Sequence, residues 1–388
     1  MESVRWQLSD DCLTFYLHGR IDSMNAPDVE DEIVACCNDN PSARVVVDLD
    51  DLEYISSAGL RVILRLGKEH PNVVLRNASS TIYEVLDMTG FTELFEVTRA
   101  YRRISVDGCE CIGKGANGMV YRIDPETVVK VYRNPDALPE IKHERDLART
   151  AFVQGLPTAI PYDVVRVGDS YGSVFELLGS QSLAELLIEG KMSVGEVAHM
   201  SADLLKLIHA TEVQDSEIPS ERAVVLGWAE FLVDYLPKEL SSKLCSLVSS
   251  LPETKHLIHG DFHIKNVMVQ QGECLLIDMD TLCHGHPIFE LASMYNAYVG
   301  FGETDASLVE NFLGVPIEVA HELWDGSLRD YLGDVDEQVL HEVEEKAIII
   351  GQMRIMRRAI RRTKNQTIID KAREHLEELV PKYDTLEF

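Results

Sequence analysis

The sequence predicts a chain of two domains, an N-terminal α/β domain followed by a larger α+β domain. Over about the first 100 residues, short β-branched runs alternate with amphipathic stretches, as in a small sheet covered by helices. From residue 109 a glycine-rich segment precedes strand-like runs, and beyond residue 291 the chain reads as successive helices. A length of 388 residues also suits two domains.

In the first domain we expect strands and helices in strict alternation. The apolar and β-branched runs predict strands at 12–19, 43–49 and 72–76, and the amphipathic runs predict helices at 26–37, 57–69 and 81–89. This order favours a small sheet with helices packed on it.

Two short segments of this domain resemble the STAS domain of anti-sigma factor antagonists. They are Val47-Asp48-Leu49 and Tyr54-Ile55-Ser56-Ser57-Ala58-Gly59-Leu60, which match a buried strand and the loop that opens the next helix. The resemblance covers about residues 1–100. It implies a protein partner and places the family's phosphorylated serine on Ser57, although Ser56 replaces the aspartate that usually precedes it.

Ser57 has two interpretations that the sequence leaves open. A hydroxyl at a helix N-terminus caps free backbone amides. A phosphate there would gain from the helix dipole and would add about −1.5 to −2 charges to a partner-binding surface. Ser57 is therefore either an N-cap or a phosphorylated switch.

The second domain opens with a glycine-rich segment. Gly113, Gly115, Gly118 and Val120 fit the pattern G-x-G-x-x-G-x-V. The runs 119–123 and 127–132 that follow alternate with period two, so the glycines belong to a hairpin rather than to a helix start. Glycines in a hairpin let backbone amides approach phosphate groups closely.

The segment from His259 to Asn266, followed by Leu275 to Asp280, indicates phosphoryl transfer. Asp261 and Asn266 lie five residues apart, and Asp278 ends a short apolar run. A nucleoside triphosphate needs Mg²⁺ to bridge its oxygens, and Mg²⁺ takes hard oxygen ligands from one or two side chains. A separate carboxylate must then orient the attacking hydroxyl. The alternative is that these residues are helix caps and turn residues.

From Cys109 to the C-terminus the chain resembles the protein-kinase-like superfamily, and within it the aminoglycoside phosphotransferase and choline kinase branch. The resemblance rests on the glycine-rich segment, His-Gly-Asp at 259–261, Asp-Met-Asp at 278–280 and the segment 284–292. It implies a bilobal fold with a linker at 101–108, an N-lobe at 109–178 and a helical C-lobe at 179–388.

The resemblance also implies a role for each matching residue. Asp261 would orient and deprotonate the acceptor hydroxyl, and Asn266 and Asp278 would hold Mg²⁺. Lys130 would bind the phosphates of ATP or GTP with Glu144 behind it, and the amides of the hinge 174–179 would meet the base. The residues that the resemblance places at the nucleotide are Gly113, Gly115, Gly118, Val120, Lys130, Glu144, Glu176 and Leu178, with Asp280 and His259 as additional site candidates.

The chain departs from the family pattern at two places. Glu290 stands where the family has an aspartate that braces the catalytic loop. No Ala-Pro-Glu signature follows Asp280, and only a few residues separate it from the next helix, so a peptide-docking segment is not expected. A small-molecule hydroxyl is the better acceptor.

Five histidines close together in sequence suggest an alternative metal site. A zinc site needs tightly and regularly spaced ligands, which these residues lack. We therefore expect hydrogen bonds that shape loops instead. The histidines are His256, His259, His263, His284 and His286.

Charge and composition bound the partners. A net charge of −29 argues against nucleic acid and mildly favours a cationic acceptor through long-range attraction. The chain lacks a signal segment and a membrane-length apolar run, and its eight cysteines fit a reducing compartment, so we expect a cytosolic protein.

One basic stripe departs from this acidic composition. Its members fall at helical spacing: Arg354, Arg357, Arg358, Arg361, Arg362 and Lys364. We expect it to pair with Glu342, Glu344 and Glu345 or with the acidic N-terminal domain, and the alternative is contact with an anionic substrate or a membrane.

Three functions fit the sequence. The first is an ATP-dependent phosphotransferase acting on a small hydroxyl compound, with the STAS domain as a regulatory or protein-binding module. The second is a kinase that phosphorylates Ser57 in the same or another chain. The third is a nucleotide-sensing pseudokinase joined to a binding module, which ranks last because every residue needed for transfer is present.

Overall fold

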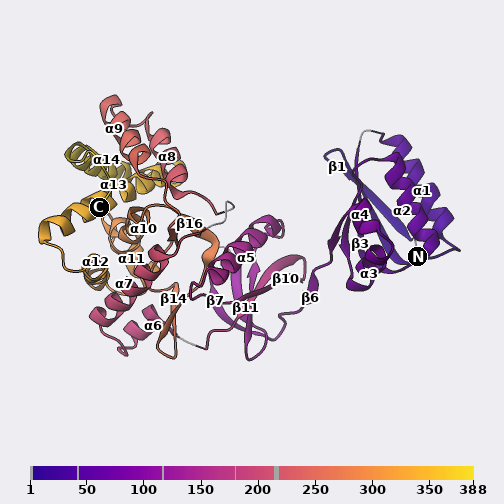
Figure 1. Cartoon of the computed structure of the whole chain (residues 1–388), viewed down its shortest axis with the longest axis horizontal. Helices are drawn as coiled ribbons and strands as arrows, with labels where there is room; N and C mark the ends of the chain where they lie inside the picture. Colours follow the sequence, from indigo (N-terminus) through magenta and orange to yellow (C-terminus); the bar gives the residue numbers. More distant parts are fainter. Residues whose placement is uncertain (1–2, 42, 116–117, 180, 214–217) are drawn as a thin grey trace. The chain divides into compact units, whose positions relative to one another are not determined.

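The computed structural model describes residues 3–41, 43–115, 118–179, 181–213 and 218–388. It forms two compact units, coloured along the chain in Figure 1. The first comprises Met1–Ser105 together with Val165–Gly168, and the second comprises Val106–Val164 together with Asp169–Phe388.

The first unit is a sheet whose strands are connected by helices. The strands lie in the order β1 (Val4–Ser9), β2 (Cys12–Ile21), β3 (Arg44–Ile55), β4 (Val74–Ala78) and β5 (Glu96–Arg99). The helices are α1 (Ala26–Asp39), α2 (Ser57–Glu69), α3 (Ser80–Met88) and α4 (Phe91–Leu94). The predicted alternation is confirmed; the sequence missed the edge strands β1 and β5.

Apart from the antiparallel pair β1 and β2, neighbouring strands of this sheet run parallel. Each parallel connection passes through a helix, because parallel neighbours need a long crossover. The core is apolar, and Leu13, Phe15, Leu49 and Leu75 are fully buried.

The start of α2 corrects the interpretation of Ser57 as a cap. Ser56 is the capping residue, and its hydroxyl oxygen accepts from the amides of Ala58 and Gly59 at 3.2 and 3.5 Å. Ser57 is the first residue of the helix, and it is exposed. The Ser57 hydroxyl is therefore not the N-cap of α2.

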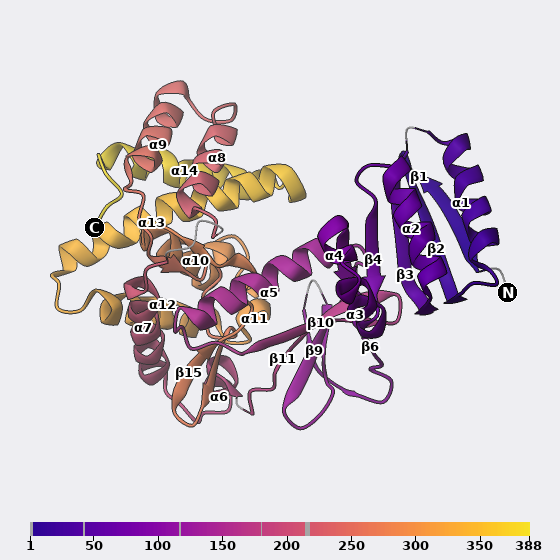
Figure 2. The ribbon, with the colours of Figure 1, turned by 45° about the vertical axis from the view of Figure 1, so that its right-hand side comes forward.

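The N-lobe of the second unit is an antiparallel sheet with one helix. Its strands follow the order β10 (Pro161–Val167), β11 (Ser170–Glu176), β9 (Thr127–Tyr132), β8 (Gly118–Arg122) and β7 (Glu110–Lys114). Helix α5 (Leu138–Val153) lies along it in Figure 2. Strand β6 (Arg102–Ile104) falls within the stretch expected to be a linker, and it pairs with residues 165–167 of β10.

The C-lobe is mostly helical, as predicted. Its helices are α6 (Leu183–Ile188), α7 (Val194–Ala210), α8 (Glu221–Leu232), α9 (Lys238–Ser250), α10 (Ile288–Tyr298), α11 (Ser307–Leu313), α12 (Ile317–Leu332), α13 (Glu337–Arg358) and α14 (Gln366–Leu379). Every residue of α10 is buried, so this helix forms the centre of the lobe. A hairpin of β14 (Val267–Gln270) and β15 (Glu273–Leu276) follows residues 259–266, which carry the predicted base Asp261 and are called the catalytic segment for that predicted role.

In the described part of the chain, no helix combines the length and apolarity needed to cross a bilayer.

The buried His209 on α7 gives the stability of the C-lobe a specific pH dependence. Its Nδ1 lies 2.8 Å from the hydroxyl of Tyr331 on α12, and its buried Nε2 finds no partner among the described residues. Burial, and then the nearby His256 and His286, lower the pKa of His209 to about 3. Protonation of this ring therefore opposes folding.

We predict that His209→Gln makes the stability less dependent on pH. At pH 5 the unfolded chain binds a proton at this histidine, whose unfolded pKa is about 6.5, and the folded protein does not. The histidine thus costs about 2 kcal/mol of stability on going from pH 7.5 to pH 5. Urea unfolding at both pH values checks this, with the exposed His321→Gln as control. Identical pH dependence in wild type and His209→Gln would contradict it.

Candidate active site

Lys130 lies between two carboxylates that come from different parts of the domain. Its ammonium nitrogen is 2.8 Å from Oε1 of Glu144 on α5 and 2.7 Å from Oδ1 of Asp278, which follows β15. Burial lowers the pKa of Lys130, but the charges of Glu144 and Asp278 outweigh it and raise the pKa well above its usual value. The lysine therefore stays charged and joins the N-lobe to the segment after the hairpin.

Glu144 is fixed from its other side as well. The hydroxyl of Tyr132, two residues beyond Lys130 on β9, donates to its second carboxylate oxygen. Glu144 is buried, at 4% exposure, which a solvated surface glutamate would not be. Because Glu144 is buried and bonded to both Tyr132 and Lys130, it fixes the orientation of the lysine side chain.

A group of three carboxylates lies around this lysine. Glu144, Asp278 and Asp280 present oxygens within 4.8 Å of one another, the one such group of acidic, histidine or cysteine side chains among the described residues. Desolvation of the carboxylate, and then the charges of Asp278 and Glu144, raise the pKa of Asp280 to about 7. Accumulated negative charge on hard oxygen ligands fits a Mg²⁺ ion.

Asn266 offers a further oxygen near this group. Its side-chain nitrogen donates to the carbonyl of Asp261 at 3.0 Å, which leaves the amide oxygen available to a metal. The amide of Ile277, next to Asp278, donates to the carbonyl of Asn266 at 3.0 Å. The backbone thus connects the two residues that the sequence proposed as metal ligands.

Asp261 lies in the catalytic segment, partly exposed. Its Oδ2 lies 3.6 Å from Nε2 of His263. Burial raises the pKa of Asp261, but the hydrogen bond and charge of His263, with help from Arg354 and His259, bring it below the usual value. The carboxylate is therefore ionised at neutral pH and ready to accept a hydrogen bond from a hydroxyl.

Glu290 braces the catalytic segment in spite of its extra methylene. Its carboxylate accepts from the amide of His259 at 2.5 Å and from the amide of Gly260 at 3.1 and 3.2 Å. Glu290 is completely buried, and burial raises its pKa to about 7 against the effect of these amides. The longer side chain keeps the bracing role that the family gives to aspartate.

Other contacts fix the same backbone. Nε2 of His259 lies 3.1 Å from the carbonyl of Ile277, and the hydroxyl of Thr281 donates to the carbonyl of His259 at 2.8 Å. Gly260 has a φ of +81°, and a Cβ there would lie 2.5 Å from the carbonyl oxygen of Thr281. The segment before Asp261 is therefore locked to the segment that carries Asp278.

The glycine-rich hairpin is described except at its tip, because residues 116 and 117 lie outside the described part. A Cβ on Gly118 would lie 2.3 Å from the carbonyl of Val131, so this glycine is required by strand packing. Val120 pairs with Lys130 across β8 and β9, while Gly113 and Gly115 have room around them. Phosphate binding by these glycines stays a prediction.

The hinge differs in part from the expectation. The amide of Glu176 donates to the carbonyl of Ile160 at 3.0 Å, and the amide of Leu177 donates to Glu126 at 2.7 Å. Both amides are therefore used within the protein and are not free to meet the base. Leu178 is buried, and nucleotide binding by Glu176 and Leu178 stays a prediction.

The clustered histidines shape loops, as expected. Nδ1 of His284 lies 2.8 Å from the carbonyl of Thr254, and the amide of Ile288 donates to Nδ1 of His286 at 3.2 Å. None of the histidines belongs to a group of candidate metal ligands within the described ranges.

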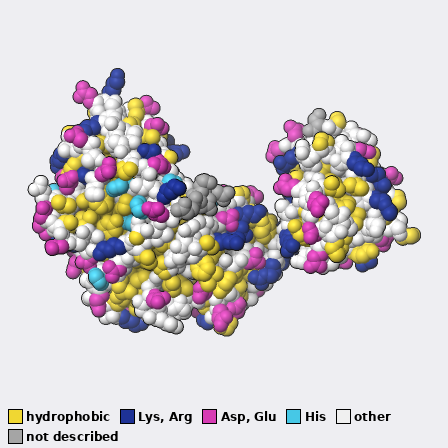
Figure 3. Space-filling view, viewed as in Figure 1, with side chains coloured by type: hydrophobic (Ala, Val, Ile, Leu, Met, Phe, Trp, Pro, Cys, Tyr) yellow, Lys and Arg dark blue, Asp and Glu magenta, His cyan; other side chains and the backbone are white. Residues whose placement is uncertain are grey.

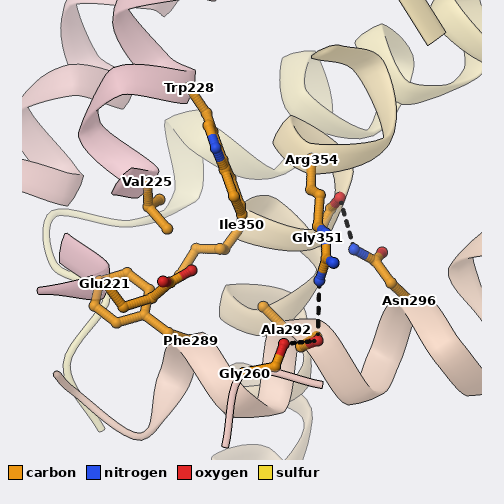
Figure 4. A pocket seen from close by; sticks show the side chains of 11 residues that line it. Glu221, Val225, Trp228, Gly260, Phe289, Ala292, Asn296, Ile350, Gly351 and Arg354 are labelled. Atoms are coloured by element: carbon orange, nitrogen blue, oxygen red, sulfur yellow. Dashed lines mark hydrogen bonds between the residues drawn. The ribbon is translucent and has the colours of Figure 1, made fainter. Parts of the chain in front are cut away.

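Sequence reasoning missed a pocket that lies beside the catalytic segment (Figure 4). Its wall comes from α8, α10 and α13, and its lining includes Glu221, Val225, Trp228, Phe289, Ser293, Ile350 and Arg354. The Ser293 hydroxyl donates to the carbonyl of Gly260 at 2.9 Å, and Arg354 donates to that hydroxyl at 3.0 Å. Of these residues, only Arg354 was singled out by the sequence, as a member of the basic stripe.

Two family models match the chain. The model described as "Phosphotransferase enzyme family" matches residues 109–322, and the STAS domain model matches residues 4–104. A curated relative, the putative anti-sigma factor antagonist BtrV of Bordetella bronchiseptica, is 39% identical over 95 residues, which are 24% of this chain and 81% of the relative.

Solved structures resemble the chain at low identity. The ADP-bound aminoglycoside phosphotransferase APH(2'')-Ib is 16% identical and covers 80% of this chain and 99% of its own, with a TM-score of 0.48. A choline/ethanolamine kinase family protein from Mesorhizobium loti is 12% identical and covers 70% of this chain and 87% of its own, with a TM-score of 0.45.

We predict that Glu290→Ala destabilises the domain, because the substitution leaves buried amides of His259 and Gly260 without an acceptor. Each unsatisfied amide costs about 1–3 kcal/mol, so the loss is at least about 2 kcal/mol. Urea unfolding measures it, with the exposed Glu374→Ala as control. An Ala variant as stable as the control would show that the brace contributes nothing.

Proposed function

The chain belongs to the phosphotransferase enzyme family, and we propose that it transfers the γ-phosphoryl group of ATP or GTP to a hydroxyl of a small molecule. The observation that carries this proposal is the position of Lys130 against both Glu144 and Asp278. Lys130 and Asp278 are 148 positions apart in the sequence, and the fold joins them with Glu144 into one charged cluster. That cluster is the arrangement needed to bind a metal-complexed triphosphate.

We assign the nucleotide side to the N-lobe. The ammonium of Lys130 binds phosphate oxygens, and Glu144 keeps it directed toward them. Asp278 and Asn266 would hold Mg²⁺, with Asp280 as a further carboxylate beside Asp278. When bound, the ion neutralises charge on the triphosphate oxygens during transfer.

Asp261 receives the proton of the acceptor. A bond forms between the acceptor oxygen and the γ-phosphorus as the bond to the departing nucleoside diphosphate breaks, and the hydroxyl proton passes to Asp261. Because the pKa of Asp261 is low, this carboxylate is a weak base that acts mainly by orienting the hydroxyl. Glu290 and Thr281 hold the backbone that positions it.

A small acceptor is favoured by the chain between Asp280 and α10. The short helical turn Met279–Thr281 and strand β16 (Cys283–His284) fill this stretch before α10 begins at Ile288. The stretch leaves no room for a long segment on which a peptide would dock. The STAS domain then serves as a regulatory or protein-binding module, in keeping with the anti-sigma factor antagonist that it resembles.

The exposure of Ser57 at the start of α2 favours a second candidate function. Because Ser56 does the capping, the Ser57 hydroxyl is exposed and free to accept a phosphoryl group at a helix N-terminus. Phosphorylation of Ser57 by this chain, on itself or on another copy, is therefore a further proposed activity.

We predict that two aspartate substitutions impair different steps, one the transfer and the other the binding of the nucleotide. Asp261→Asn should lower turnover about 10²- to 10⁴-fold and leave nucleotide affinity unchanged, because it removes the proton acceptor alone. Asp278→Ala should abolish Mg²⁺-dependent nucleotide binding. Calorimetric titration with Mg·ATP and a panel of hydroxyl compounds (choline, amino sugars, aminoglycosides, homoserine) measures both.

The matched control is Asp234→Asn, which changes an exposed aspartate elsewhere in the domain. Nucleotide binding that survives Asp278→Ala unchanged would refute the proposed site. Nucleotide binding without transfer to any compound would instead favour the nucleotide-sensing pseudokinase.

We predict that incubation with Mg·ATP adds one phosphate, about 80 Da, to wild-type protein if the second activity operates, and none to Ser57→Ala. Intact-mass spectrometry measures this, and Ser80→Ala, which changes the exposed first residue of α3, serves as the control. Wild-type protein that gains no mass after prolonged incubation eliminates the second function.

A further inference from the structure

His263 lies in the catalytic segment, two residues after Asp261, and its side chain is buried at 4% exposure. On the face shown in Figure 3, histidine side chains appear only as small separate spots. Nε2 of His263 lies 3.6 Å from Oδ2 of Asp261. Nδ1 of the same ring is also buried, and it has no partner among the residues that the structure describes. The polar contact that this ring makes within the described part of the chain is therefore the one with Asp261.

The main chain that carries His263 is held in place. The amide of Asn266 donates to the carbonyl of His263 at 2.8 Å, and the amide of Ile264 donates to the hydroxyl of Tyr298 on α10 at 3.0 Å. The carbonyl of Ile264 accepts from the amide of Ala184 on α6 at 3.1 Å. The histidine ring therefore projects from a fixed backbone.

Phe312 of α11 holds the ring itself. The rings of Phe312 and His263 meet edge to face, with their centroids 4.8 Å apart and their planes at 83°. This is one of the arrangements that aromatic rings prefer. The ammonium of Lys265 also donates to the carbonyl of Phe312 at 2.9 Å. Because α11 is joined to the catalytic segment at these two points, the orientation of the histidine ring is fixed.

Packing alone does not explain a histidine at this position. A buried nitrogen without a partner costs free energy, and a leucine would fill a similar space without that cost. Native structures leave few buried polar atoms unpaired, so each exception calls for an explanation. The contact of His263 with Asp261 provides one, because an apolar side chain has no donor to offer a carboxylate.

We propose that His263 is a positioning residue for Asp261 and that Phe312 acts through it. The tautomer with its proton on Nε2 donates to Oδ2, which turns Oδ1 toward the acceptor hydroxyl, whose proton Oδ1 receives during transfer. Contacts between catalytic groups are often long before the substrate binds and shorten in its complex, which fits the separation of 3.6 Å. The proposal rests on the function proposed above, in which Asp261 receives that proton.

The first test determines the direction of the Asp261 carboxylate and needs no turnover. Crystal structures of the full chain are compared for wild type, His263→Leu and His263→Gln. The amide nitrogen of glutamine can replace Nε2 as a donor, whereas leucine has none. We expect the carboxylate to keep its direction in His263→Gln and to take another direction in His263→Leu. An unchanged carboxylate in His263→Leu overturns the proposal.

The second test measures turnover of the best acceptor from the panel above. His263→Leu should lower kcat about 10- to 100-fold, because a reacting group is misdirected, with little change in KM for Mg·ATP. His263→Gln should recover much of this loss. The matched control is His209→Leu, which also removes a buried ring with an unpartnered nitrogen but one that bonds Tyr331, and it should keep kcat near the wild-type value. Urea unfolding verifies that each variant is folded.

A double-mutant cycle tests whether Phe312 acts through His263. Phe312→Leu alone should lower kcat, though less than His263→Leu does. The two substitutions together should lower kcat no further than His263→Leu alone, because residues that act through one contact are not additive. Phe152→Leu, which changes an exposed phenylalanine on α5, is the control. Additive losses overturn the role of Phe312.

The outcomes separate this inference from the proposed function. Equal kcat in wild type and His263→Leu overturns the positioning role and leaves the phosphotransferase intact. Wild-type protein that transfers phosphate to no compound overturns the proposed function, while the crystal structures still decide whether His263 directs the carboxylate.

Discussion

The kinase-like domain depends on the charge cluster that Lys130 forms with Glu144 and Asp278. A buried ammonium is costly unless it is paired, and here it is paired with two acids at once. The lysine comes from the sheet, Glu144 from the helix, and Asp278 from the segment behind the hairpin. Removal of Lys130 would leave the buried Glu144 without its cationic partner and would break the link to Asp278, so the lysine joins all three elements.

The catalytic segment obtains its rigidity from a second, separate set of contacts. Glu290 holds two of its amides, Thr281 and Ile277 hold His259, and Ser293 holds the carbonyl of Gly260. Because these partners come from α10 and from the segment next to Asp278, the proposed base Asp261 and the proposed metal ligand Asp278 are fixed against each other. Preorganisation of this kind matters most for phosphoryl transfer, where positioning provides most of the catalysis.

The sequence predicted what depends on spacing and missed what depends on three-dimensional neighbours. Lys130 and Asp278 could be predicted because Lys130 lies on a strand-like run after the glycine-rich segment and Asp278 ends a short apolar run. Ser56, not Ser57, caps α2, because the capping position is set by backbone torsion angles that a one-residue shift in sequence does not reveal. The predicted pairing of the basic stripe with Glu342, Glu344 and Glu345 was wrong, because these glutamates bond other residues: Lys346, Trp324 and Lys382.

The pocket shows the same limit. Its wall comes from α8, α10 and α13, which lie far apart in the sequence, so no local pattern predicts it. Arg354 on α13 donates to the hydroxyl of Ser293 on α10, and that hydroxyl donates to the carbonyl of Gly260. The charge of Arg354 also helps to hold the pKa of Asp261 below its usual value. The ionised state of Asp261 therefore depends on a side chain that only the folded domain brings near it.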